Sequence, residues 1–154
     1  MSEITENKDR ETPAPVRYTL PKSTKLRHRT LVEGLFEHGR KLYDFPLRAI
    51  WRTLDDGELT ESFRIAVPGG IGRVQMMITV PKRKRRRAVD RVLLRRRIRE
   101  AFRLNRHILE HALTDHPEIR TLEVAFIYLH DENVASAQIH RKMQRLLTKI
   151  ASQL

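Results

Sequence analysis

The stretch that decides the fold is KRKRRRAVDRVLLRRRIREAFRLNR, residues 82–106, in which thirteen residues are Lys or Arg and only Asp90 and Glu100 oppose them. The same stretch carries apolar side chains at helical spacing. On a wheel of about 100° per residue, one arc holds Leu94, Ile98, Ala101, Phe102, Asn105, Ile108, Leu109 and Ala112. We therefore expect a folded helix from about Arg91 to Leu113, with Asp90 as its N-cap. So many like charges on one helix call for a polyanionic partner.

The composition favours a single basic domain. The chain has 154 residues and a net charge of +12, and its isoelectric point near 10.8 favours nucleic acid or an anionic surface as partner. It has no cysteine, which excludes disulfides and thiolate metal sites. No apolar run is long enough to cross a membrane. Residues 1–17 are polar and lack the apolar segment of a secretory signal, so we expect a disordered tail, a folded domain over residues 18–154, and a cytoplasmic location.

The rest of the chain reads as alternating helices and strands. Thr30 and Glu33 fit a capping box, and Gly39 suits the left-handed residue beyond a helix. Turn residues separate the apolar runs, at 55–57 and at 69–72. The predicted strands cover Phe45–Leu54, Ser62–Pro68, Arg73–Val80 and the doubly apolar Thr121–His130, and a last helix covers Ser136–Leu154. The predicted class is α+β, a single domain of order αβββαβα.

The arginine ladder is the strongest functional signal. It consists of five side chains at roughly i, i+4 spacing and spans about 20 Å: Arg91, Arg95, Arg99, Arg103 and Arg106. Guanidinium forks bind phosphate oxygens in pairs and stack on bases. The alternative is a solvated face with carboxylate partners, but only Glu100 is available there. The run Lys82–Arg87 adds phosphate contacts at the start of the helix.

Two further motifs favour structural explanations. His107, Glu110 and His111 match a zinc-peptidase pattern, yet the cationic helix opposes a dication and no third ligand stands nearby, so a solvated face is the better account. The glycines of residues 69–72 lack the Gly-Lys-Ser/Thr of a phosphate-binding loop and precede a strand, which indicates a tight turn. We find neither a Ser-His-Asp arrangement nor a carboxylate pair, and predict no catalytic residue and no metal site in this chain.

Aromatic side chains near the first helix and strand are candidates for stacking on unpaired bases. Trp51 shares a strand with Arg48 and Arg52, which favours a place near an exposed sheet edge or groove. Phe36 lies on the preceding helix. For both aromatic residues, an ordinary core position is an equal alternative, and for Phe45 the core is favoured.

Several segments together resemble the protein component of bacterial ribonuclease P. The segment Ala88–Arg91 followed by Arg95–Arg103 resembles the family's A-V-x-R-N-R-x-K-R-x-x-R-E helix. Leu20–Lys22, Leu26–Arg27 and Leu35–Gly39 resemble its opening, and Ile78–Arg83 resembles its strand into the helix. Two departures are visible. Val92 and Leu93 stand where the family has Asn-Arg, and Val32 stands where it often places an aromatic residue.

The resemblance implies a fold and a set of roles. The fold is an α/β sandwich like the second domain of ribosomal protein S5, with a left-handed βαβ crossover. The RNA subunit carries the catalytic centre and most of the magnesium, and no protein partner is required. The protein assists removal of the 5′ leader from precursor tRNA. Matching positions for RNA binding are Lys82, Arg83, Lys84, Arg87, Arg91, Arg95, Arg96, Arg99 and Arg103, and those for a leader-binding cleft are Phe36, Arg48 and Trp51.

Two other classes of protein share the basic character. A ribosomal or ribosome-assembly protein would bind RNA without any part in cleavage. A sequence-specific DNA binder would need a helix-turn-helix or a dimerising zipper, and the sequence shows neither pattern.

Overall fold

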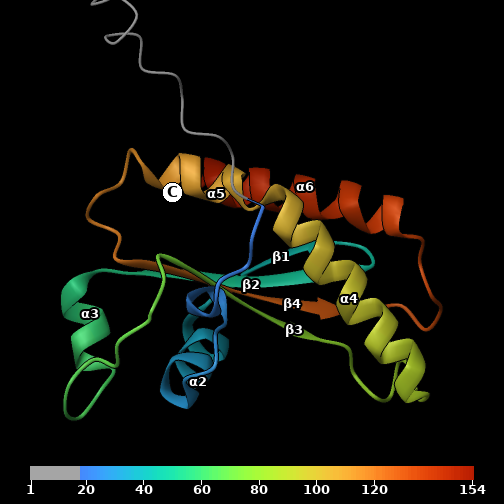
Figure 1. Cartoon of the computed structure of the whole chain (residues 1–154), viewed down its shortest axis with the longest axis horizontal. Helices are drawn as coiled ribbons and strands as arrows, with labels where there is room; N and C mark the ends of the chain where they lie inside the picture. Colours follow the sequence, from blue (N-terminus) through green and yellow to red (C-terminus); the bar gives the residue numbers. More distant parts are fainter. Residues whose placement is uncertain (1–17) are drawn as a thin grey trace, which may run out of the picture.

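The computed structural model describes residues 18–154, which form one four-stranded sheet with helices on both faces (Figure 1). The strand order is β1-β2-β4-β3, with β3 parallel to β4 and the other two pairs antiparallel. The strands are β1 Arg40–Asp44, β2 Leu47–Leu54, β3 Val74–Thr79 and β4 Thr121–Tyr128. The predicted tail at residues 1–17 lies outside the described residues.

The helices divide between the two faces of the sheet. Three of them pack on one face: α4 Ala88–Asn105, α5 His107–Leu113 and α6 Ser136–Ser152. The other face carries α2 Arg29–His38 and the short α3 Asp56–Glu61, and a 3-10 turn, η1, covers Lys22–Thr24. The α4–α5 segment makes the βαβ crossover between the parallel strands β3 and β4. Within the described part of the chain, no helix is both long and apolar enough to cross a membrane.

The predicted α+β class is confirmed, and the order αβββαβα holds once α3 and the break between α4 and α5 are set aside. Successive side chains of β2 point to opposite faces of the sheet, so they contribute to two separate hydrophobic cores. Leu47, Ala49 and Trp51 join the larger core under α4–α6, while Ile50 and Leu54 join the smaller core under α2. Strand β4 is covered on both faces, as its continuous apolar run predicts.

The predicted strand at Ser62–Pro68 is wrong. Although apolar and polar residues alternate there, the segment pairs with no strand, and Ile65 is 95% exposed. The strand that the sequence pattern did not predict is the short, polar β1, which pairs with β2 at the sheet edge. The predicted turn at 55–57 is the start of α3, where the amide of Glu58 donates to Asp55 Oδ1 over 2.7 Å and completes a capping box.

The predicted caps of the first long helix are also wrong. Helix α2 starts at Arg29 after His28, and neither Thr30 nor Glu33 forms the capping box. Gly39 has φ −69° and is not left-handed. A Cβ at Gly39 would lie 2.5 Å from Ile50 Cγ2, so this glycine is needed because α2 approaches β2 closely.

The central helix is two helices. Helix α4 begins at Ala88, so Asp90 lies in its first turn and is not the N-cap. There Asp90 pairs with Arg85 at 3.1 Å and accepts a hydrogen bond from Asn133 over 3.0 Å. Helix α4 ends at Asn105, and α5 continues after Arg106. The break turns Arg106 into the protein, where its side chain is buried.

Candidate nucleic-acid interface

The loop of residues 81–87 between β3 and α4, which we call the basic loop, is held in shape by its own arginines. Arg91 Nη1 donates to the carbonyls of Arg85 and Arg86 over 3.0 and 2.7 Å. Arg85 in turn pairs with Asp90 and donates to the carbonyl of Asp131. Arg91 is thus partly engaged in fixing the loop from which the other cations project.

Most of the predicted RNA-binding cations have no acidic partner. Within residues 18–154, eight cations of the basic loop and α4 form no ion pair and no side-chain hydrogen bond: Lys82, Arg83, Lys84, Arg86, Arg87, Arg95, Arg96 and Arg99. The loop residues Arg83–Arg87 line a shallow depression of about 540 Å³ together with the carboxylates of Asp90 and Asp131. A concentration of unpaired guanidinium and ammonium groups on one loop and one helix is the electrostatic footprint of phosphate binding.

The two C-terminal members of the ladder behave differently. Arg103 forms hydrogen bonds with Glu100 and donates from Nη1 to the carbonyl of Tyr18 over 2.8 Å. This hydrogen bonding lowers the pKa of Glu100, so the carboxylate stays ionised. Arg106 lies 3.4 Å from Glu110 and is buried, so its predicted place on the exposed stripe is wrong. The exposed ladder therefore centres on Arg95 and Arg99.

The predicted leader-binding residues are not brought together on one face. Phe36 is exposed on α2, and Arg48 points to the same side of the sheet, where its guanidinium lies 5.4 Å from the Tyr43 ring centroid. Trp51 is only 2% exposed and lies on the opposite face. Of its two predicted places, an exposed sheet edge or a groove, the edge is wrong, because β1 covers that edge of β2 and Trp51 packs under α4–α6.

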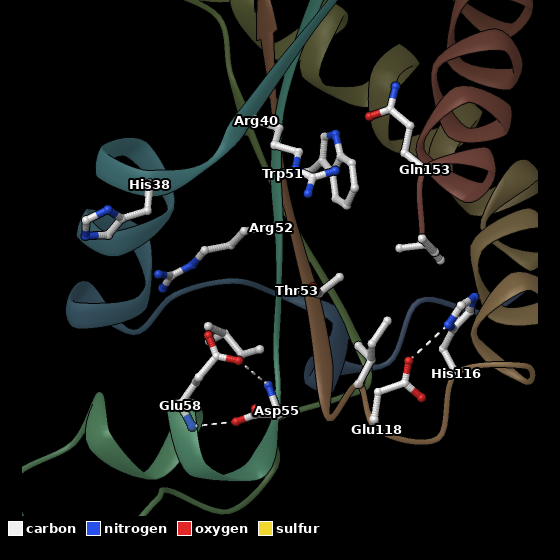
Figure 2. A pocket seen from close by; sticks show the side chains of 13 residues that line it. His38, Arg40, Trp51, Arg52, Thr53, Asp55, Glu58, His116, Glu118 and Gln153 are labelled. Carbon is white, nitrogen blue, oxygen red and sulfur yellow. Dashed lines mark hydrogen bonds and ion pairs between the residues drawn. The ribbon is translucent and has the colours of Figure 1, made fainter.

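Trp51 instead borders a pocket of about 350 Å³ at the end of β2. Figure 2 shows Trp51 beside Arg40 on one side of the strand and Arg52 on the other, and the Arg40 guanidinium lies 5.3 Å from the indole centroid. Polar groups in this pocket partner one another: His116 Nδ1 lies 3.0 Å from Glu118 Oε1. The pKa of Glu118 is lowered first by a backbone hydrogen bond and then by His116.

The zinc-like motif is engaged in packing. His107 packs edge-on against the Tyr18 ring at a centroid distance of 6.4 Å, and Glu110 faces Arg106. Among residues 18–154 we find no group of three or more His, Asp or Glu side chains placed to hold a metal ion.

A buried ion pair ties α2 to the sheet, and the sequence analysis missed it. Arg52 Nε lies 2.6 Å from Glu123 Oε1, and Arg52 Nη2 donates to the Leu31 carbonyl of α2 over 3.3 Å. Gly34 makes room, since a Cβ there would lie 2.5 Å from Arg52 Nη2. Burial raises the pKa of Glu123, against the effect of Arg52. The available signal was Glu123, the one charged residue of β4, together with an arginine in the otherwise largely apolar β2.

Comparison with known proteins decides the family. The family model described as Ribonuclease P matches residues 20–151. The chain belongs to the ribonuclease P protein family. Two relatives, ribonuclease P protein components from two Porphyromonas gingivalis strains, are each 32% identical over 138 residues, which is 90% of both chains. The component from Idiomarina loihiensis is 44% identical over 43 residues, 28% of this chain and 34% of its own.

Solved ribonuclease P proteins share the fold. The Staphylococcus aureus protein superposes with a TM-score of 0.55 at 17% identity, covering 84% of this chain and 96% of its own. The Thermotoga maritima protein gives 0.56 at 20% identity, covering 81% and 96%. Family membership assigns the chain to tRNA processing as the protein subunit of ribonuclease P, with an RNA subunit as its partner. The rival assignment to a ribosomal protein is thereby set aside.

Proposed function

We propose that this ribonuclease P subunit docks on its RNA subunit through the basic loop and the exposed side of α4. The observation that carries the proposal is the set of eight cations without ion-pair partners in the described residues, five on the basic loop and three along α4. Phosphates of folded RNA offer the matching array of anions. Val92, exposed between Arg91 and Arg95, adds an apolar contact where the family has a polar one.

The single-stranded 5′ leader of precursor tRNA is the proposed ligand of the opposite, α2-covered face. Phe36 offers an exposed ring and Arg48 a cation on that face. Partly buried Met77 and Ile127 extend the apolar surface beside α2. An aromatic ring with nearby cations binds unpaired nucleotides by stacking and by charge. Trp51 has no part in this proposal.

The RNA subunit is proposed to carry the catalytic centre and to bind most of the magnesium. The cationic face of the protein repels divalent ions, so its contribution is to neutralise phosphates where two RNA molecules meet. That neutralisation lowers their mutual repulsion and raises the affinity for substrate. No side chain of this chain enters the chemistry.

Reconstitution tests the proposal. Adding the full chain to its cognate RNA subunit should restore cleavage of precursor tRNA at low magnesium, because the protein replaces part of the ionic screening. The measurement is the rate of 5′-leader release against magnesium concentration, with the RNA alone as the control. An identical magnesium requirement with and without the protein would contradict the proposed role.

Phe36→Ala should weaken the binding of precursor tRNA that has a leader and leave mature tRNA unaffected. Stacking of one base on an aromatic side chain contributes about 1–3 kcal/mol, so the expected loss is roughly tenfold. The measurement is the dissociation constant of the reconstituted complex for substrates with graded leader lengths. Tyr18→Ala is a matched control, since Tyr18 is an exposed aromatic residue away from this face. Equal losses with and without a leader would rule out leader contact.

A further inference from the structure

The tip of the β1–β2 hairpin presents aromatic side chains that the fold does not use. Tyr43 and Phe45 are 57% and 55% exposed, so the predicted core position of Phe45 is wrong, because this residue lies in the turn before β2 and not on the strand. The turn between the strands is fixed, because the amide of Leu129 donates to the Pro46 carbonyl over 2.8 Å and holds the turn against the end of β4. Large exposed rings at the end of β1 and on the fixed turn that follows it are typical of a contact surface.

Each ring has a flat, nitrogen-bearing neighbour. The Phe45 and His130 ring centroids lie 5.0 Å apart, with planes inclined at 44°. The Arg48 guanidinium lies over Tyr43. We call Tyr43, Phe45 and His130 the hairpin platform; Arg48, at its border, stays assigned to the proposed leader-binding face. Aromatic rings and guanidinium planes are the surfaces on which proteins stack unpaired nucleobases.

The hairpin platform adjoins the basic loop. Figure 1 shows the β1–β2 turn, the β4–α6 connection and the β3–α4 connection at one end of the sheet. Arg85 of the loop donates to the carbonyl of Asp131, next to His130. On the other side, Asp44 accepts from Lys142 and lies 3.1 Å from Arg145 of α6. Two carboxylates thus lie beside the platform: Asp44, between Tyr43 and Phe45 in the chain, and Asp131, which bonds to His130 over 2.9 Å. The α6 cations are therefore already paired, and the phosphate-binding cations beside the platform are those of the basic loop.

We propose that the hairpin platform stacks an unpaired nucleobase of the RNA subunit, next to the phosphates that the basic loop binds. This inference rests on the proposed docking of that RNA. The RNA subunit is a better candidate than the leader because β1 separates the platform from the end of α2 that carries Phe36. Five residues of strand at about 3.3 Å each span roughly 16 Å, whereas the basic loop is in direct contact with the segment next to His130.

Phe45→Ala tests the proposal in the full chain. We expect binding of the full-length RNA subunit, measured without precursor tRNA, to weaken about tenfold, as alanine substitution at a stacking ring does. The slope of log affinity against log salt should stay unchanged, because a phenyl ring releases no counterions. Phe45→Trp should retain the wild-type affinity. Since Phe45 is largely in solvent, thermal unfolding followed by circular dichroism should match the wild type for both variants.

Three outcomes would overturn the inference: unchanged affinity of Phe45→Ala for the RNA subunit, a loss that appears only with leader-bearing substrate, or a change confined to the sedimentation of the protein alone. The last would point to a second copy of the chain as the occupant. Measuring Arg95→Ala/Arg99→Ala in parallel separates the two proposals. If that variant loses affinity and Phe45→Ala does not, only the proposed stacking on the hairpin platform is refuted. If neither variant loses affinity, the proposed docking through the basic loop and α4 is refuted as well.

Discussion

Replacing Arg52 with methionine is expected to lower the free energy of unfolding by about 3–5 kcal/mol, because it leaves a buried carboxylate without its counter-charge. Glu123 is fully buried, and Arg52 is its ion-pair partner at 2.6 Å. Methionine keeps most of the apolar stem of arginine, so little of the loss comes from a cavity. Urea unfolding at neutral pH, followed by circular dichroism, measures the change.

Companion variants show whether the missing charge is the cause. Arg52→Met/Glu123→Leu should recover most of the loss, since an apolar pair of similar volume replaces a buried ion pair at little cost. Gly34→Ala should destabilise the wild type, because its Cβ would lie 2.5 Å from Arg52 Nη2, and should be neutral or stabilising when Arg52 is methionine. A wild-type unfolding midpoint for Arg52→Met would show that the pair does not stabilise the fold.

The loss of unfolding free energy caused by Arg52→Met should depend on pH with a definite sign. Burial raises the pKa of Glu123 above its ordinary value of 4.5, and Arg52 acts in the opposite direction. Without Arg52 the folded-state pKa rises further. The folded protein then retains a proton that the unfolded chain has released, so stability falls as pH rises from 4.5 through the raised pKa. The deficit should be small below pH 4.5 and complete above the raised pKa, and a pH-independent deficit would contradict this cause.

Arg95→Ala/Arg99→Ala is expected to weaken binding to the RNA subunit by about tenfold or more per arginine, since a charge-assisted hydrogen bond contributes about 1.5–3 kcal/mol. The slope of log affinity against log salt should also flatten by about 1.4–1.8, because two phosphate contacts and their released counterions are lost. Filter binding over a range of salt concentrations measures both quantities. Neither arginine has an acidic partner among the described residues, so the fold should be unaffected.

A control away from α4 separates the docking surface from net charge, and it is compared with the single variants Arg95→Ala and Arg99→Ala, each of which also removes one charge. Arg64→Ala removes an exposed arginine from the connection that follows α3, away from α4. It should leave both the affinity and the salt slope near the wild-type values. An unchanged slope for Arg95→Ala/Arg99→Ala, or an equal effect of Arg64→Ala, would refute α4 as the docking surface.

Patterns that depend on one segment alone were predictable. The apolar arc of 91–113, the doubly apolar strand near 121–130 and the amphipathic C-terminal helix all appear in the structure within a few residues. Each of these segments carries a strong period that one element satisfies by itself. That cations of α4 lack acidic partners was predictable for the same reason, because the segment itself contains too few acidic residues.

The strands chosen at the sheet edge were not predictable from the segments alone. Ser62–Pro68 has a better strand pattern than Arg40–Asp44, yet β2 pairs with the latter. β1 follows α2 directly and reaches the free edge of β2 through a short turn, whereas the capping box of Asp55 and Glu58 starts a helix instead. Edge pairing depends on which segment can reach the edge.

The sequence by itself determined a basic α+β domain with a cationic helix, since charge density and apolar period are properties of a single segment. Only the tertiary structure decided which cations stay free: the half-buried Arg95 and the exposed Arg99 have no ion-pair partner among the described residues, while Arg103 donates to the Tyr18 carbonyl and Arg106 turns inward. It also placed the Trp51 side chain on the face of the sheet that α4–α6 cover, and it paired Arg52 with Glu123. These positions depend on which distant groups meet across strands and helix ends, and no single segment encodes that.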